Sequence, residues 1–285
     1  MHFQVNKKNQ TGAALLIVIM ITAIMSIIMT LMLHQSRLDM KLTALVKNRT
    51  IAELSLETVQ STFVFDLMTT PLHLVGPKYT NDEFVFDSLV SDFKGSVAIV
   101  DKTSISVQDL GGMVSLKPYD EKNFNRLLIQ QGYSNDMLLA FNDKLEDWQD
   151  VDSLVRLEGK EKGDYADYPF FPSNMSLQSV NELAYILEPT VFKNIKPWIV
   201  LYGQGDINRQ YTPEALYSAI GIEVTKNKES TSNYSDGEGA YVYPSGRYFI
   251  KLSFKDRGVS LNKQFLLIRG LDTFQPFFVA NEKLF

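Results

Sequence analysis

The feature that most constrains this chain is an uncharged apolar run near its N-terminus, from Ala13 to Leu33. About twenty consecutive apolar residues are the length at which a helix crosses the hydrocarbon core of a bilayer. A cleaved secretory signal has a shorter apolar core followed by a small-x-small cleavage site, and the residues after Leu33 offer no such site. The run therefore predicts a helix over residues 13–33 that remains in the membrane as an anchor.

Three hydroxyl residues, Thr22, Ser26 and Thr30, are the polar members of this run. Their spacing of four places them on one face of a helix. Hydroxyls on such a face can bond back to their own helix or across to a neighbouring helix. The face is therefore interpreted either as tolerated polar groups in a lone span or as a surface for packing. Basic residues lie on both sides of the run, so the positive-inside rule does not orient it by itself.

The helix is predicted to continue beyond the membrane, because neither glycine nor proline occurs between Ala13 and Pro71. An apolar stripe with alternating steps of four and three predicts an amphipathic continuation over residues 34–70 that ends near residue 68. The whole helix would be a rod of roughly 80 Å. Its outer half is interpreted either as a dimeric coiled-coil stalk or as a helix packed on the chain's own globular domain, and the small number of heptads favours the second. The stripe consists of Leu38, Leu42, Leu45, Ala52, Leu56, Val59 and Phe63.

Composition excludes several classes of site. The 285 residues include no cysteine, which excludes disulfides and thiolate metal sites, and three histidines, too few to favour a zinc centre. The net charge of -5 argues against nucleic acid as a partner, because phosphate binding needs a basic face. The sequence has no nucleophile elbow, phosphate-binding loop or dinucleotide fingerprint, so no enzyme is predicted.

Beyond the long helix the patterning changes twice. Residues 95–112 alternate and are rich in β-branched side chains, which predicts two strands with a turn near Asp101-Lys102. The last helical segment should begin with Thr212 as N-cap and Pro213 at its first position. The polar stretch 226–239 is predicted as an exposed loop, and strands joined by hairpins should follow it. The helical segments are expected at 123–131, 135–146, 176–187, 189–201 and 213–220.

A dense acidic segment is the candidate metal site. Nine carboxylates fall between Asp143 and Asp167, and Ca²⁺ takes about six to eight oxygen ligands, many of them carboxylates. The spacing is not that of an EF-hand, so the segment is interpreted either as a solvated acidic loop or as a loop that wraps one calcium ion. The candidate ligands are Asp147, Asp150, Asp152, Glu158, Glu161 and Asp164.

The N-terminus resembles the leader of type IV pilins and type II secretion pseudopilins. Lys7 and Lys8 are followed by Thr11-Gly12 and then by the apolar run from Ala13. The resemblance implies that a prepilin peptidase cleaves between Gly12 and Ala13, that Ala13 is N-methylated, and that residues 1–12 are a leader that is lost. It also implies a single-pass protein of the bacterial inner membrane, with its C-terminal domain in the periplasm.

One difference from most pilins and three similar segments point to a particular family within this superfamily. The fifth mature position, usually Glu in the superfamily, is Ile17. A carboxylate buried in lipid is costly unless it is paired, and the large minor pseudopilins of the general secretion pathway protein K family also lack this Glu. The segments similar to stretches of that family are LEDWQDVDS (145–153), GKEKGDYADYPFFPSNMSLQSVNEL (159–183) and GQGDINRQYTPEAL (203–216).

The resemblance implies an α+β fold, in which a pilin-like long N-terminal helix packs on a small antiparallel sheet and a large all-helical domain is inserted. The pilin-like α/β domain would comprise residues 71–111 and 238–285, and the inserted helical domain residues 112–237. The family's association with calcium supports the candidate metal site.

The implied function is that of a minor pseudopilin at the tip of the type II secretion pseudopilus, which initiates or caps assembly for protein export across the outer membrane. The implied partners are other minor pseudopilins, the prepilin peptidase and the inner membrane, with secreted substrates or the outer-membrane secretin as further candidates. The alternatives are a minor pilin of a type IV pilus or competence system, and a membrane-anchored periplasmic protein of unknown activity. Helix packing is expected at Thr22, Ser26, Thr30, Leu38, Leu42, Leu45, Leu56, Val59 and Phe63.

Overall fold

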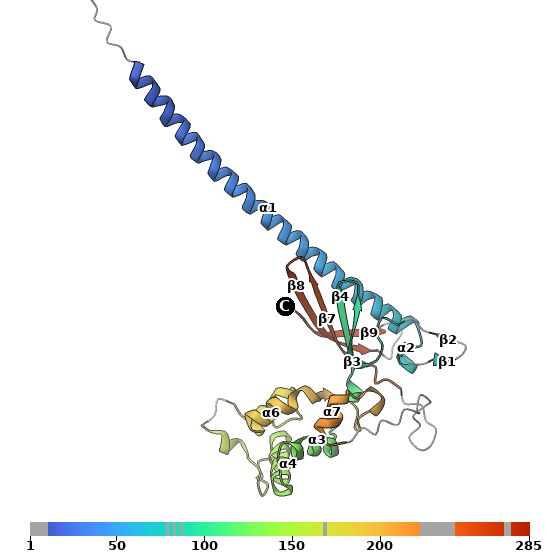
Figure 1. Cartoon of the computed structure of the whole chain (residues 1–285). Helices are drawn as coiled ribbons and strands as arrows, with labels where there is room; N and C mark the ends of the chain where they lie inside the picture. Colours follow the sequence, from blue (N-terminus) through green and yellow to red (C-terminus); the bar gives the residue numbers. More distant parts are fainter. Residues whose placement is uncertain are drawn as a thin grey trace, which may run out of the picture.

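A computed structural model describes residues 11–77, 80–81, 84–85, 88–167, 170–222, 243–270 and 275–285. Its dominant element is the 59-residue helix α1 (Thr11–Thr69), which projects far beyond the rest of the molecule (Figure 1). The predicted end near residue 68 is confirmed. The helix stops there because Pro71 disfavours helical geometry at Thr70 and has no N–H to donate. The short helix α2 (Leu72–Val75) follows, and then the two-residue strands β1 (Thr80–Asn81) and β2 (Phe84–Val85).

A five-stranded antiparallel sheet lies beside the C-terminal half of α1, with strand order β3-β4-β7-β8-β9. The predicted turn at Asp101-Lys102 is confirmed, and Asp101 adopts a positive φ of 53° there. Arg257 and Gly258 make the corresponding turn between β7 and β8, with φ values of 48° and 78°. The strands are β3 (Lys94–Val100), β4 (Thr103–Asp109), β7 (Arg247–Asp256), β8 (Val259–Arg269) and β9 (Phe277–Leu284).

The apolar stripe of α1 divides into two parts. Ala52, Leu56, Val59 and Phe63 are buried against the inward-facing side chains of β4, β7 and β8. The earlier members of the stripe are exposed, Leu42 for example by 60%. The outer half of the helix therefore packs on the chain's own sheet, as the second of the two predicted arrangements requires.

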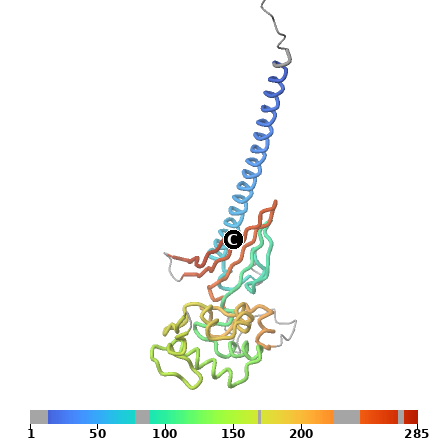
Figure 2. The backbone as a smooth tube through the Cα atoms, turned by 90° about the vertical axis from the view of Figure 1, so that its left-hand side faces the viewer, coloured from blue at the N-terminus to red at the C-terminus, as the bar shows by residue number. Residues whose placement is uncertain are grey.

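A mainly helical region comprises the chain from η1 to α7 and has a separate apolar core. Figures 1 and 2 place this region beyond the sheet, on the side away from the N-terminal half of α1. Two short strands within it pair in parallel, Val114 with Ile199 and Lys117 with Tyr202. Its elements are η1 (Leu110–Gly112), β5 (Val114–Lys117), α3 (Glu121–Gln130), α4 (Asn135–Gln149), η2 (Lys162–Tyr165), η3 (Val180–Glu182), α5 (Leu183–Ile186), α6 (Pro189–Ile195), η4 (Lys196–Trp198), β6 (Ile199–Tyr202), η5 (Arg209–Tyr211) and α7 (Glu214–Ala219).

Three details of the helical region differ from the predictions. Residues 199–201, expected to end a helix, form β6, because pairing with β5 satisfies their backbone. Residues 176–179 are not helical, and a capping box of Ser179 and Glu182 starts the turn η3 instead. Thr212 is not the N-cap of α7: its hydroxyl donates to the carbonyl of Asn208, and Pro213 occupies the cap position. The predicted loop 226–239 lies outside the described residues.

Candidate functional site

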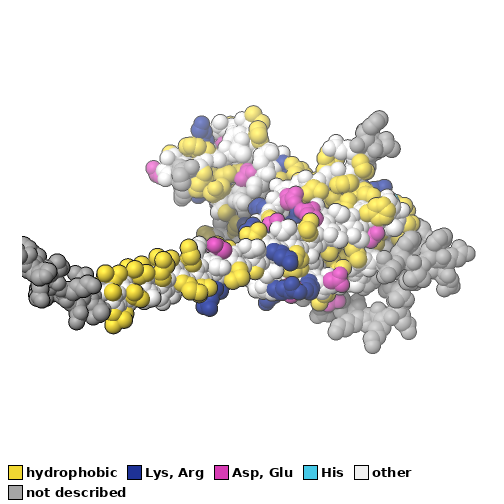
Figure 3. All heavy atoms as spheres, turned by 90° about the horizontal axis from the view of Figure 1, so that it is seen from above, with side chains coloured by type: hydrophobic (Ala, Val, Ile, Leu, Met, Phe, Trp, Pro, Cys, Tyr) yellow, Lys and Arg dark blue, Asp and Glu magenta, His cyan; other side chains and the backbone are white. Residues whose placement is uncertain are grey.

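The N-terminal half of α1 is a candidate surface for assembly. From Ala14 onward the helix is long and apolar enough to cross a membrane, and apolar side chains cover this part of it in Figure 3. Of the predicted hydroxyl face, Thr22 donates to the carbonyl of Ile19 (2.9 Å) and Thr30 to that of Ser26 (2.8 Å). These two hydroxyls are therefore satisfied within their own helix, and the apolar side chains around them are free to pack.

The predicted packing stripe belongs partly to the chain itself. Leu56, Val59 and Phe63 lie in the helix–sheet core, so they cannot also contact neighbouring helices. The prediction that these three residues contact other helices is therefore wrong. A periodic apolar stripe predicts burial, but it does not identify the surface that buries it. Leu38, Leu42 and Leu45 are exposed. Their contact with other helices stays a prediction.

The processing residues lie at the start of α1, which begins at Thr11. The backbone of Gly12 and Ala13 is helical, and their side chains are outside the description, as are residues 1–10 altogether. Ile17 lies one turn further along and is exposed. Cleavage between Gly12 and Ala13 therefore stays a prediction.

The acidic segment is organised by a buried aspartate and an arginine. Helix α4 carries Asp147, whose side chain is fully buried. The guanidinium of Arg156 donates through Nη1 to Asp147 Oδ1 (2.6 Å) and Asp150 Oδ2 (2.5 Å). Its Nε forms an ion pair with Glu146 Oε2 (2.8 Å). The backbone N–H of Arg156 donates to the second oxygen of Asp147 (3.2 Å). The loop after α4 is thereby folded back onto the end of the helix.

A glycine permits this close approach. A methyl group placed on Gly159 would overlap Asp147 Oδ2, so any larger residue would push the loop away from the buried carboxylate. Two residues later comes Glu161, which is 5% exposed. Neither of its carboxylate oxygens has a hydrogen-bond partner among the described residues. Burial, followed by nearby acidic groups such as Asp150 and Asp147, raises the pKa of Glu161.

The structure brings three of the six predicted calcium ligands together. Asp147, Asp150 and Glu161 each offer an oxygen, and these oxygens lie within 4.8 Å of one another. The charged form of Arg156 is strongly favoured beside them: hydrogen bonds to Asp150 and Asp147 raise the pKa of the guanidinium. The group combines a buried orphan carboxylate with two carboxylates that a guanidinium neutralises.

The other three predicted ligands have local roles. Asp152 accepts from the N–H of Leu154 (2.8 Å), and Asp164 accepts from the N–H of Glu161 (2.9 Å). The backbone N–H of Glu158 donates to Asp143 (3.1 Å), and its side chain is exposed. The carboxylates of Asp152 and Asp164 therefore shape the loop, and none of these three residues is a member of the group of three.

Two residues of this site were missed from the sequence. Arg156 is the single arginine within the acidic segment, and that isolation was a usable signal. Gly159 gave no signal, because its importance comes from a contact with Asp147 that only the fold creates.

Comparison with known proteins agrees with this architecture. Residues 101–204, from β4 to the end of β6, match the family model described as Type II secretion system (T2SS), protein K. A solved structure, the GspK-GspI-GspJ complex from the type 2 secretion system of enterotoxigenic Escherichia coli, contains a chain with a similar fold. The TM-score is 0.55 at 13% sequence identity, covering 85% of this chain and 99% of that chain. No curated protein sequence matches the chain significantly.

The long helix, the antiparallel sheet and the helical region define the class: an α+β pilin-like fold, as predicted, with one candidate membrane span among the described residues. The match over residues 101–204 indicates the particular family: this part of the chain is similar to protein K of the type II secretion system. Members of this family are structural components of the secretion system.

Proposed function

We propose that this chain is the subunit at the tip of the type II secretion pseudopilus, where it initiates or caps assembly for protein export across the outer membrane. The observation that supports this role is the stacking of the molecule along its long axis. The helical region lies beyond the sheet, on the side away from the membrane-spanning half of α1 (Figure 2). A subunit added above this one would need the space that the helical region occupies.

The surface of α1 supports assembly from below. Its exposed apolar half offers Leu38, Leu42 and Leu45 to other helices. Ile17 stands where related subunits carry a glutamate, and a tip subunit needs no carboxylate to pair with a subunit above it. The partners proposed for this surface are other minor pseudopilins, and the solved chain with a similar fold comes from a GspK-GspI-GspJ complex. Secreted substrates or the outer-membrane secretin are proposed to meet the helical region.

Locating this subunit within isolated pseudopili tests the proposal. We would tag the full chain at Phe285, which is exposed, shear pseudopili from cells and label the tag with gold. Label at one end of each filament is expected. Label along the filament would contradict a tip role, and label on type IV pili would favour the alternative class. A tag on the major subunit is the control that should decorate the whole length.

Processing is tested by intact mass. The protein purified from cells with the prepilin peptidase should lack residues 1–12 and carry one added methyl group on Ala13. The same protein from cells without the peptidase, or with Gly12→Leu, should keep the leader. An uncut chain in both strains would favour a plain membrane-anchored protein.

We propose in addition that Asp147, Asp150 and Glu161 hold a calcium ion. The donor chemistry fits: three carboxylates converge within 4.8 Å, and buried Glu161 lacks any other partner among the described residues. A bound Ca²⁺ would supply positive charge that neutralises them. The guanidinium of Arg156 now contacts two of the three, so it would have to withdraw from them.

That competition makes the calcium proposal testable with the full chain in detergent. Adding Ca²⁺ should raise the unfolding temperature, and Mg²⁺ should do so less because it releases its water reluctantly. Glu161→Gln should abolish the response, whereas Asp143→Asn, outside the group, should keep it. Arg156→Gln should tighten Ca²⁺ binding. A calcium response that survives Glu161→Gln would contradict this site.

A further inference from the structure

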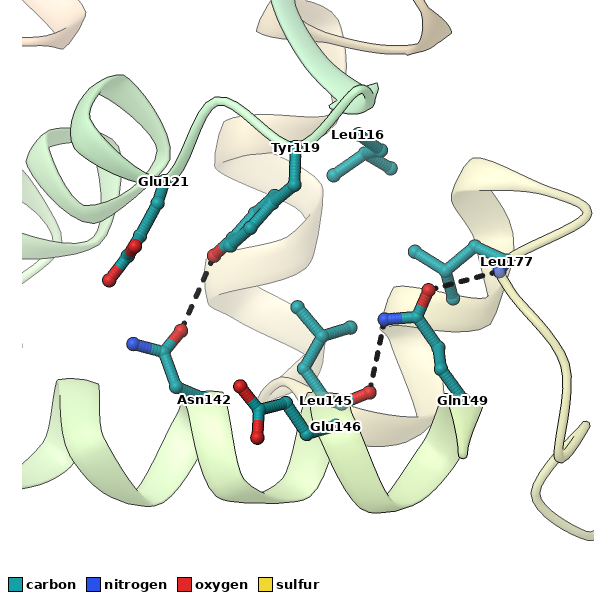
Figure 4. Close-up of a pocket in the computed structure, with 8 residues that line it drawn as sticks. All are labelled: Leu116, Tyr119, Glu121, Asn142, Leu145, Glu146, Gln149 and Leu177. Carbon is teal, nitrogen blue, oxygen red and sulfur yellow. Dashed lines mark hydrogen bonds between the residues drawn. The ribbon is translucent and has the colours of Figure 1, made fainter. Parts of the chain in front are cut away.

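A cavity of about 170 Å³ opens between helix α4, the residues that lead into α3, and the segment before η3. This volume is far above the about 15 Å³ that a single water needs, so it has room for a side chain. One part of its wall is apolar and is made by Leu116, Leu145 and Leu177 (Figure 4). Glu121, Tyr119, Asn142 and Glu146 supply polar groups, which Figure 4 shows on the side of the cavity away from Leu177. None of the three carboxylates Asp147, Asp150 and Glu161 lines this cavity, whereas Glu146 lines it and also forms an ion pair with Arg156.

The polar groups around this cavity are mostly hydrogen-bond acceptors. The hydroxyl of Tyr119 donates a hydrogen bond to Asn142 Oδ1 (3.4 Å). Its oxygen can then serve a ligand only as an acceptor. Both groups of the Gln149 amide are used inside the protein, one by the carbonyl of Leu145 (3.1 Å) and one by the N–H of Leu177 (3.2 Å). The carboxylates of Glu121 and Glu146 are acceptors only. Glu121, and the oxygen of Glu146 that Arg156 does not contact, therefore favour a ligand that brings donors and positive charge.

The electrostatics of Tyr119 agree with this arrangement. Burial, followed by the charges of Glu121, Asp120 and Glu146, raises the pKa of the phenol. Both cavity carboxylates therefore lie close enough to influence the phenol oxygen. The ring itself is held by Phe124, at 5.7 Å between ring centroids, so the acceptor is fixed in place.

We propose that this cavity is a binding site for an arginine side chain presented by a partner protein. The guanidinium has five donors, no acceptor and a planar fork that matches carboxylates and stacks on aromatic rings, here that of Tyr119. Its aliphatic stem would lie along Leu116, Leu145 and Leu177. The proposal rests on the cavity alone and is independent of the position of the chain in a pseudopilus.

A protein is favoured over free arginine as the source because an exposed leucine neighbours the cavity. Leu139 is 64% exposed on α4, and its spacing of three and seven places it on the same helix face as Asn142 and Glu146. A residue next to the bound arginine can cover this leucine, and a free amino acid cannot.

The experiment follows the methyl NMR signals of Leu116, Leu145 and Leu177 in the full chain embedded in nanodiscs. Acetyl-arginine amide should shift all three in a saturable way, and the uncharged acetyl-citrulline amide should not. Glu121→Gln should weaken the arginine probe by at least about tenfold, because a charge-assisted pair is lost. Glu214→Gln is the matched control, an exposed glutamate in the first turn of another helix, and should leave the affinity unchanged.

Two further arms decide the occupant. A short peptide with leucine beside arginine should bind at least about threefold more tightly than acetyl-arginine amide, and Leu139→Ser should remove that gain. Equal affinity for peptide and free arginine would overturn a protein partner. Equal binding of citrulline or lysine probes, or insensitivity to Glu121→Gln in a variant with an unchanged ligand-free spectrum, would overturn the arginine site.

Discussion

The sheet region and the helical region each hold a cation between carboxylates, but they bury opposite partners. In the sheet region the cation is buried: Lys263 on β8 is 3% exposed and bonds Glu57 of α1 and Glu282 of β9, whose carboxylates are about half exposed. In the helical region the anion is buried: Asp147 is enclosed, and Arg156 reaches it from a partly exposed position.

The difference reflects what holds each region together. The helix and sheet are aligned by continuous apolar faces, and Lys263 adds a charge at their margin. The loop after α4 has no such face, since Val151, Leu154, Val155 and Leu157 all point to solvent. Polar contacts to Asp147 determine its path instead. We therefore expect the largest losses of stability to come from replacing apolar residues in the sheet region and polar residues in the helical region.

The largest effect should come from the helix–sheet core. Phe63→Ala should lower the free energy of unfolding by about 3–5 kcal/mol, because a fully buried ring leaves a cavity. Phe65→Ala, two residues away on the same helix, removes a ring that is 65% exposed and should change it by less than about 1 kcal/mol. Urea unfolding of both full-length variants, followed by circular dichroism, measures the contrast. Equal effects would mean that α1 is not held by this sheet.

A second effect is expected where the two regions meet. Asp109 ends β4, is fully buried, and accepts from the N–H groups of Gly111 (2.6 Å) and Ser245 (2.7 Å). Burial raises the pKa of this carboxyl from 3.8 to about 6. Between these two pKa values the folded state binds a proton on Asp109 that the unfolded state does not. The free energy of unfolding is therefore highest below about pH 4 and falls as the pH rises to about 6. This shift in pKa corresponds to a fall of about 3 kcal/mol in the free energy of unfolding across that pH range.

The free energy of unfolding, measured from about pH 3.5 to about pH 7, tests this role of Asp109, because the range covers both of its pKa values. Asp109→Asn should flatten the slope between about pH 4 and pH 6. Asp101→Asn, an exposed aspartate in the turn before the same strand, should leave it intact. A slope that survives Asp109→Asn would assign the pH dependence to other groups.

A third effect tests the polar character of the helical region. Trp148 is buried and donates its indole N–H to Glu182 Oε2 (3.0 Å), while Glu182 Oε1 accepts from the N–H groups of Gln178 and Ser179. Trp148→Phe should cost about 2 kcal/mol, because a hydrogen bond to a charged group is lost. Amide hydrogen exchange should also quicken at Gln178 and Ser179. Trp198→Phe, at a half-buried tryptophan, is the control that should leave both amides protected.

The smallest effect should come from the buried cation of the sheet region. Lys263→Met should change stability by less than about 1 kcal/mol, because Glu57 and Glu282 can return to water and the apolar packing remains. Thermal unfolding of the full chain measures it. A loss as large as that of Phe63→Ala would show that the ion pairs, and not the apolar faces, align helix and sheet.

Much of the fold could be predicted from local patterns. The helix end near residue 68, the turn at Asp101-Lys102 and the paired strands at both ends of the helical region follow from proline, turn residues and periodicity, which act within a few residues. The same reasoning failed at residues 199–201, whose strand exists because β5, more than eighty residues earlier in the chain, pairs with it.

The candidate sites divide in the same way. The sequence alone determined an apolar span, a long amphipathic helix and an acidic segment, because hydrophobic periodicity and charge density are properties of neighbouring residues. Only the tertiary structure decided that Leu56, Val59 and Phe63 face the chain's own sheet, that Arg156 closes on Asp147, and that Glu121 and Glu146 border one cavity. These contacts depend on which distant surfaces meet, and that choice is made by packing the whole chain at once.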